Sequence, residues 1–230
     1  RLREGSPAMG VGFKAFDLTK AGVYGAEAWK QLASATTYPP VKFAPPPPPL
    51  KLKDDFEATP VGRPPAEAQV SVEGKGDSLA VTDEFAAGGK HSLKFQDASG
   101  LQSSFNPHLY YLPRHHEGFT RCAFDLRIEP ETVMYHEWRD DASPYRVGPS
   151  LWIRGGKLSV DGKELLTLPS AQWVHFEVAA PVGEKSDHTW SLTVTVSAQS
   201  AQVFSKLGNG SPDWKHLDWL GFVSQADVKT

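Results

Sequence analysis

Alternation of apolar and polar side chains in short segments is the feature that most constrains the fold of this 230-residue chain. Residues 120–128 place Cys122, Phe124 and Leu126 on one side and mostly charged residues on the other, and residues 190–196 repeat the pattern. Successive side chains of an extended strand point to opposite faces, so a period of two predicts strands with one packed and one solvated face. Half-buried strands of this kind are typical of antiparallel sheets.

Turn residues separate these segments from others with the composition of strands. Asp161 and Gly162 divide residues 157–166 as in a two-residue hairpin, because this pair tolerates the positive φ angles that the tight turn requires. No amphipathic helix interrupts the series, which predicts an all-β fold, an antiparallel two-sheet β-sandwich of jelly-roll type with a dozen or more strands. The other expected strands lie at residues 69–72, 92–95, 133–138, 150–154, 174–178 and 217–223.

Composition divides the chain into three regions. Residues 1–35 are mixed in composition, contain one weakly helical stretch, and are predicted to form an irregular N-terminal arm. Residues 36–53 include a run of prolines from Pro45 to Pro49, which cannot donate backbone hydrogen bonds and favour an extended conformation. This region is predicted to be a stiff linker, or a segment that lies along a domain surface. Residues 54–230 carry the strand pattern and are predicted to form the β-sandwich domain.

Several phrases in the third region are similar to a known family. DDFEATPVG at residues 54–62 resembles the opening strand of laminin-G-like, concanavalin-type jelly rolls of environmental bacterial proteins, and GKHSLKFQD at residues 89–97 resembles a later strand. The resemblance covers residues 54 to about 225 and implies a concanavalin-like sandwich. The aromatic-Leu-Asp-Asn-Ile phrase of the family's final strand is missing, so we expect either that the chain was cut there or that another chain supplies that strand. The remaining phrases are EWRD at 137–140, GPSLW at 148–152 and WVHFE at 173–177.

A second resemblance lies near the start of the chain. GSPAMGVGFKAFDLTKAG at residues 5–22 is similar to the closing stretch of right-handed parallel β-helix proteins. It implies that residues 1–35 are the remnant of an upstream β-helix domain, which would be a partner of the sandwich, and that Arg1 is not a natural start. An ordinary N-terminal arm is the alternative.

Charge and cysteine content exclude several classes of function. A formal net charge of -3 argues against a nucleic-acid partner, because such proteins display a basic stripe. Apolar runs are far shorter than the roughly 18 residues that span a bilayer, so no membrane partner is expected. The first residues lack the apolar centre of a signal peptide, and we expect any export signal to lie upstream of a secreted, periplasmic or cell-surface protein. Cys122 is the single cysteine, which excludes an internal disulfide.

Catalytic patterns bear on the function, because concanavalin-type sandwiches include glycosidases and polysaccharide lyases. Retaining hydrolysis requires two carboxylates about 5 Å apart, and no Glu-x-Asp-x-x-Glu strand phrase supplies them. Lyases require a neutralising cation, a base, and a tyrosine or histidine acid, and the ordered strand phrases of alginate-lyase relatives are absent. Side chains of the required types nevertheless occur: His108, Tyr110, Tyr111, His115, His116, His136, Arg139 and Tyr145.

Aromatic residues beside polar ones indicate a carbohydrate-binding surface, because flat rings stack on sugars and planar polar groups bind hydroxyls. Trp152 alternates with Leu151 and Ile153 and therefore points outward if those two lie in the core. A buried aromatic set with a structural Arg–Asp pair is the alternative. The predicted ligand-binding residues are Trp138, Arg139, Asp140, Tyr145 and Trp152, whereas Trp173, Trp190, Trp214 and Trp219 are predicted to serve packing.

Calcium is the cofactor that the sequence favours most. In jelly-roll modules of the resembled kind, a structural calcium often joins the first strand to the last. Asp54, Asp55 and Glu57 supply hard oxygen donors in the corresponding segment. A solvated strand end is the alternative.

Together these observations favour a non-catalytic accessory or carbohydrate-binding module from the C-terminal end of a secreted, polysaccharide-active β-helix protein. The parent protein would be a glycoside hydrolase or a polysaccharide lyase, and the expected partner is a polysaccharide or oligosaccharide. Two alternatives stay open: the sandwich is itself a polysaccharide hydrolase or lyase, or it is a purely structural or adhesive domain.

Overall fold

The computed structural model describes residues 6–7, 11–13, 22–45, 48–196 and 199–226, and it divides the chain into two compact units, Arg1–Pro46 and Pro47–Thr230. The first unit contains the helix α2 (Glu27–Ala35), which has no buried residue. Most of the phrase that resembles β-helix proteins lies outside the described residues. No helix in the described parts of the chain is long and apolar enough to cross a membrane.

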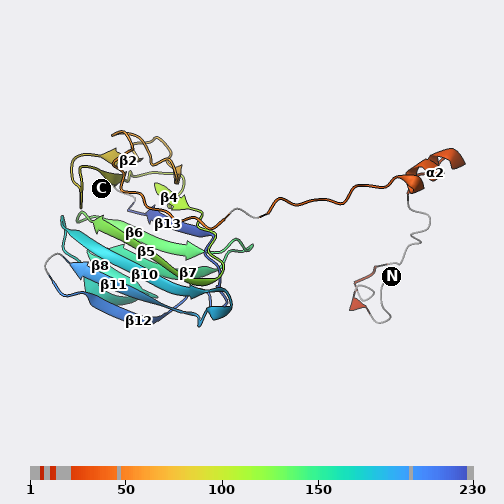
Figure 1. Cartoon of the computed structure of the whole chain (residues 1–230). Coiled ribbons are helices and arrows are strands. Elements are labelled where there is room, and N and C mark those ends of the chain that lie inside the picture. The colour runs from red at the N-terminus through yellow and green to blue at the C-terminus, as the bar shows by residue number, and fades with distance from the viewer. Residues whose placement is uncertain (1–5, 8–10, 14–21, 46–47, 197–198, 227–230) are drawn as a thin grey trace. The chain divides into compact units, whose positions relative to one another are not determined.

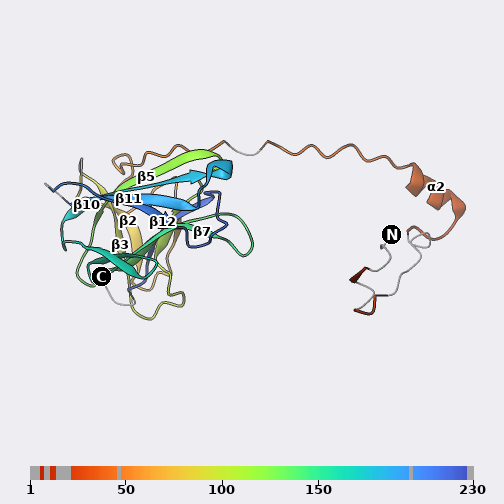
Figure 2. The ribbon, with the colours of Figure 1, turned by 90° about the horizontal axis from the view of Figure 1, so that it is seen from below.

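The second unit is an antiparallel β-sandwich, a concanavalin-like jelly roll as predicted from the alternation (Figure 1, Figure 2). Its larger sheet has seven strands and its smaller sheet has four, while a hairpin of two further strands forms a sheet of its own. In spatial order, the larger sheet contains β1 (Gln69–Ser71), β4 (His108–Tyr111), β13 (Trp219–Ser224), β6 (Val133–Arg139), β7 (Val147–Arg154), β8 (Lys157–Val160) and β9 (Lys163–Thr167). The smaller sheet contains β12 (Gln202–Gly208), β11 (Thr189–Val196), β10 (Trp173–Val182) and β5 (Gly118–Arg127), and the hairpin contains β2 (Ser78–Thr82) and β3 (Ser92–Gln96).

The core lies between the two sheets and follows from the period of two. Alternate residues of β10 and β11 are completely buried, among them Phe176 and Leu192, each with 0% exposure. They pack against alternate residues of the larger sheet such as Leu151 and Ile153. Removal of such side chains from water stabilises the fold by roughly 1.5–3 kcal/mol for each large residue.

Two connections show how local sequence sets the topology. The hairpin between β8 and β9 turns at Asp161 and Gly162, whose φ angles are 49° and 70°, which confirms the predicted two-residue turn. β13, the last described strand, lies between β4 and β6 and is paired with both. An open sheet edge, which the missing final phrase predicts, is therefore not beside β13. The end strands are β1 and β9 in the larger sheet and β12 and β5 in the smaller one.

Candidate functional site

The outward face of the larger sheet gathers the polar and aromatic side chains that the core excludes. On β6, His136 and Trp138 point inward and are buried, so Tyr135, Glu137 and Arg139 occupy the opposite face. The same alternation on the neighbouring strands completes a surface that we call the outer face. It consists of His108, Tyr110, Tyr135, Glu137, Arg139, Ser150, Trp152 and Trp219.

Strand register brings these residues together from four strands. Tyr135 is opposite Trp152 of β7, and Glu137 is opposite Ser150. On the other side of β6, Arg139 is opposite Trp219 of β13. Side chains directly opposite each other in an antiparallel pair have Cβ atoms only about 5 Å apart, so each of these pairs is in contact range.

A glycine gives Trp219 its position. A Cβ atom on Gly221 would lie 1.9 Å from the Trp219 ring, so the ring lies flat across the strand where a side chain would otherwise stand. The ring also stacks on Tyr110, with 5.5 Å between the ring centroids. Tyr110 in turn stacks on His108 at 6.2 Å. The result is a continuous row from the imidazole to the indole.

Arg139 is placed at the end of this row by rings and by a carboxylate. Its guanidinium carbon lies 4.1 Å from the centroid of the Trp219 ring and 4.2 Å from that of Tyr145. Its Nε donates a hydrogen bond to Oε1 of Glu137 at 2.5 Å, and Ser150 Oγ donates to the other carboxylate oxygen at 3.2 Å. A guanidinium has five N–H donors, so this bond leaves others for a ligand on the outer face.

His108 has the protonation state that suits a base. Its Nδ1 lies 3.1 Å from the carbonyl oxygen of Phe105 and 3.0 Å from Oδ1 of Asn106. Both atoms accept hydrogen bonds, so we assign the proton to Nδ1 and leave the lone pair on Nε2. Burial lowers the pKa of His108 below its ordinary value of 6.5, the Phe105 carbonyl opposes this shift, and the charge of Arg139 lowers the pKa further. The imidazole is therefore neutral at neutral pH.

An aromatic pair forms the other half of the outer face. Tyr135 stacks on Trp152 with 4.5 Å between ring centroids. Burial raises the pKa of the Tyr135 phenol above 10, so the phenol stays protonated. Trp152 is half-buried between the core residues Leu151 and Ile153, which confirms its predicted outward direction.

Two of the five predicted ligand-binding residues are buried. Trp138 is 0% exposed, and its Nε1 donates a hydrogen bond to Nε2 of the buried His136 at 2.9 Å. Asp140 is buried and accepts hydrogen bonds from the backbone N–H and the guanidinium of Arg146, an ion pair that shapes the loop after β6. Trp138 and Asp140 therefore have the structural roles of the alternative prediction. Arg139 and Tyr145 are in contact, and Trp152 lies on the outer face with Arg139.

Six outer-face residues are not in the predicted ligand set: His108, Tyr110, Tyr135, Glu137, Ser150 and Trp219. The sequence identifies His108 and Tyr110 only by chemical type and assigns Trp219 to packing. The alternation along β13 identifies Trp219 as an outward residue, because Leu220 and Phe222 lie on the other face of the strand and point to the core. Its contact with Tyr110 could not have been found, since it depends on the long-range pairing of β13 with β4.

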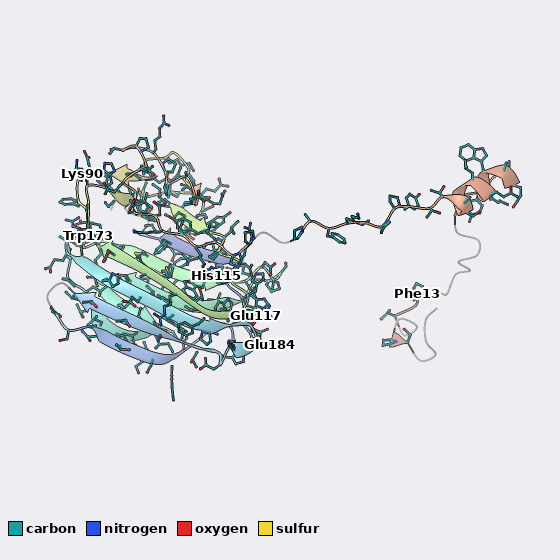
Figure 3. The ribbon with its side chains drawn as sticks, viewed as in Figure 1. Phe13, Lys90, His115, Glu117, Trp173 and Glu184 are labelled. Atoms are coloured by element: carbon teal, nitrogen blue, oxygen red, sulfur yellow. The ribbon has the colours of Figure 1, made fainter. Side chains whose placement is uncertain are left out.

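The predicted calcium ligands use their oxygens in local turns. Asp54 Oδ1 accepts the N–H of Phe56, and Asp55 Oδ1 accepts the N–H of Glu57. Glu57 Oε1 lies at the β2–β3 hairpin, where it accepts the backbone N–H of Lys90, which Figure 3 labels, and that of the following residue. Among the described residues, no three His, Cys, Asp or Glu side chains converge as a metal site. Calcium binding by these three carboxylates stays a prediction.

Comparisons with known proteins give a structural likeness and no match in sequence. No protein-family model matches the chain, and no curated protein matches its sequence. A solved structure of endo-β-1,4-glucuronan lyase from the fungus Trichoderma reesei is similar, with 10% identity and a TM-score of 0.48 over 71% of this chain and 81% of that one.

This finding corrects the main functional expectation. The similar protein is a catalytic lyase, which contradicts the prediction of a non-catalytic accessory or carbohydrate-binding module, and we do not retain that prediction. The likeness gives no residue of this chain a role. The chemistry that the chain supports rests on its own side chains.

Proposed function

We propose that the outer face binds a uronate-containing polysaccharide and cleaves it by β-elimination. The observation that carries this proposal is the row His108–Tyr110–Trp219–Arg139, in which a neutral imidazole and a phenol lie on the same face as a guanidinium fixed between two rings. β-Elimination requires a base, a proton donor and a cation beside the substrate carboxylate. This row contains one side chain for each of these roles.

The proposed reaction uses each group once. N–H donors of Arg139 bind the uronate carboxylate and stabilise the charge that develops when the neighbouring C5–H bond breaks. The lone pair of His108 Nε2 takes that proton, the electron pair forms the C4=C5 double bond, and the C4–O bond breaks. The Tyr110 hydroxyl gives its proton to the leaving oxygen. Exchange with water then returns the proton from His108 and reprotonates Tyr110, so no other reactant is consumed.

A lyase fits the outer face better than a hydrolase. Glycoside hydrolysis requires a pair of carboxyl groups about 5 to 9.5 Å apart. Glu137 is the one carboxylate among the outward residues of β4, β13, β6 and β7, all of which the structure describes. Its two oxygens already accept hydrogen bonds from Arg139 and Ser150, so its evident role is to orient the guanidinium.

Aromatic rings supply the binding surface for sugar units. Trp152 is supported from one side by Tyr135 and remains partly open to solvent. The C–H bonds of a pyranose stack well on such a face, since burial of apolar area is favourable and costs little conformational entropy. We assign Trp152 to a sugar-binding subsite beside the reacting unit.

The test is incubation of the whole chain with a panel of uronate polysaccharides, with measurement of the ultraviolet absorbance of the unsaturated product. We expect product with at least one member of the panel. His108→Ala and Tyr110→Phe should each reduce the rate by about 100-fold or more. Matched controls are His175→Ala, an exposed histidine of the smaller sheet, and Tyr111→Phe, whose ring faces inward.

Loss of activity in both controls to the same extent as in the variants would contradict the assigned roles. Production of new reducing ends without ultraviolet absorbance would show hydrolysis instead and would overturn the elimination.

Other features of the parent protein are proposals of the same kind. The phrases quoted from residues 54–177 support a laminin-G-like module in a secreted, periplasmic or cell-surface protein, and residues 5–22 support an upstream β-helix partner. Oxygen-rich residues 54, 55 and 57 support a structural calcium. Thermal unfolding with calcium and with a chelator tests the last proposal, and identical midpoints would contradict it.

A further inference from the structure

An open edge interrupts the sandwich between β5 and β3. β5 is the end strand of the smaller sheet and pairs with β10 alone, while β3 pairs with β2 alone. The other edge of β2 already has a neighbour, since Val81 exchanges backbone hydrogen bonds with Gly62 and Arg63. Among the described residues, one edge of β5 and one edge of β3 therefore have no strand partner. An edge of this kind presents a row of unpaired N–H and C=O groups.

The apolar side chains beside this edge are less covered than their equivalents in the rest of the sheet. On β10, Phe176 and Val178 are 0% exposed. The inward residues Phe124 on β5 and Phe95 on β3 belong to the same core cluster and are only half-buried. The core therefore lacks a layer of side chains at this position.

A cavity of about 1050 Å³ occupies the gap. Both β5 and β3 line it, and core residues of the larger sheet such as Leu220 and Phe222 form its floor. It extends along most of β5, from Thr120 to Arg127, and its lining includes Trp173, opposite Arg127 at one end, and His115, bonded to Thr120 at the other. Figure 3 labels Trp173 and His115 toward opposite ends of the sheet.

We infer that this cavity accepts an extended strand from another polypeptide chain, with apolar residues at every second position. A lipid or other apolar ligand would cover the two strand edges and leave their backbone groups buried without partners, which is costly. An added strand pairs these groups and points alternate side chains at the exposed part of the core. The ten residues of β5 offer an edge of about 30 Å, which matches a strand of eight to ten residues.

The charges beside the gap specify the polar face of that strand. Cations and carboxylates both line the cavity, and most of them are paired within the chain. Lys94 of β3 pairs with Glu84, Arg127 of β5 pairs with Glu129, and Asp125 pairs with His175. Arg121 is exposed, its guanidinium carbon lies 5.3 Å from the centroid of the Phe119 ring, and none of the described carboxylates forms an ion pair with it. Opposite charges on neighbouring strands stabilise the pair. The partner strand should therefore have apolar residues at every second position and an acidic residue opposite Arg121.

The test is amide hydrogen exchange of the full chain with two ten-residue peptides, one of alternating valine and glutamate and one of alternating valine and lysine. We expect the glutamate peptide to slow exchange in β5 and β3 and to bind more tightly than the lysine peptide. Arg121→Glu, an exposed substitution that leaves the core unchanged, should reduce affinity for the glutamate peptide about fivefold and improve affinity for the lysine peptide. Arg154→Glu, on an exposed residue of β7, is the matched control and should change neither affinity.

Three outcomes would overturn the inference. One is unchanged exchange in β5 and β3 at saturating peptide. Another is a peptide with the same composition in two blocks, valines first, that protects these strands equally well, since a blocked sequence cannot alternate. The third is strong protection of the β5 and β3 amides in the free protein, which would show that the chain's own polypeptide already covers the edge.

Discussion

At the scale of single residues, the direction of a side chain decides between structure and function. Trp138 and Trp152 are both tryptophans on adjacent strands, yet one is completely buried and the other lies on the outer face. The alternation of side chains along each strand explains the difference. Trp138 lies on the same face of β6 as the buried His136, whereas Trp152 lies on the face of β7 opposite to the core residue Leu151. Sequence alone could assign Trp152 correctly from its apolar neighbours. It could not assign Trp138, whose neighbours on β6 are polar on both faces.

The contrast predicts opposite effects of the two substitutions. Trp138→Ala removes a buried indole and leaves His136 Nε2 without its donor, so it should lower the free energy of unfolding by about 3–5 kcal/mol. Trp152→Ala should change stability by less than about 1 kcal/mol and reduce affinity for polysaccharide. Urea denaturation and a binding assay on both variants measure this. Equal loss of stability would show that Trp152 is a core residue.

In the proposed elimination, His108 determines how the rate depends on pH. Its pKa is lowered below 6.5 by burial, and it accepts a proton only in the neutral form. The rate should therefore be constant near neutral pH and fall as the pH decreases through the lowered pKa of His108. A rate profile of the His175→Ala control should keep this shape. A rate that rises as the pH falls below 6 would exclude His108 as the base.

A second histidine, His136, makes the stability of the fold depend on pH. Burial lowers the pKa of His136 to about 3, from 6.5 in the unfolded chain, so the unfolded state binds more protons between these values. The stabilising contribution is complete above pH 6.5 and is lost as the pH falls toward 3. Denaturant unfolding between pH 7 and 5, above the range in which most carboxylates titrate, should show decreasing stability. His136→Phe, which cannot titrate, should reduce this slope, and an unchanged slope would contradict the assignment.

At the scale of elements, strands were predictable and their partners were not. The alternation located most strands to within a few residues, and Asp161–Gly162 fixed one hairpin. The outer face instead depends on β13 pairing between β4 and β6, which joins segments about 80 to 110 residues apart in the sequence. Local patterns contain no information on such pairing, because register is set by the packed face as a whole.

Substitution of Gly221 tests whether the position of Trp219 on β13 matters for activity. Gly221→Ala would place a methyl group within the Trp219 ring, so the ring and the guanidinium of Arg139 stacked on it must move. We expect a loss of activity of at least tenfold with the fold retained. Gly208→Ala in β12 is the matched control, because nothing lies within 4 Å of the added atom. Wild-type activity in Gly221→Ala would show that the position of Trp219 is unimportant.

At the scale of the whole molecule, the question is where the sandwich begins. Composition places the start at residue 54, after the prolines, whereas the compact unit begins at Pro47. Leu50 accounts for the difference. Its N–H donates a hydrogen bond to the carbonyl of Pro113, its own carbonyl lies 2.7 Å from Nε2 of His115, and its side chain packs against the core. A leucine beside a proline run gives no sign of these contacts in the sequence.

Two shortened chains test whether the sandwich begins at residue 47 or at residue 54. A chain of residues 47–230 should unfold at the same temperature as the full chain, because α2 buries no residue and the described core residues begin at Leu50. A chain of residues 54–230 should lose about 2–4 kcal/mol, from the apolar burial of Leu50 and its two hydrogen bonds. Leu50→Ala in the full chain should reproduce the apolar part of that loss. Equal stability of both shortened chains would mean that the proline-rich region is only a linker, and that Leu50 rests on the sandwich without stabilising it.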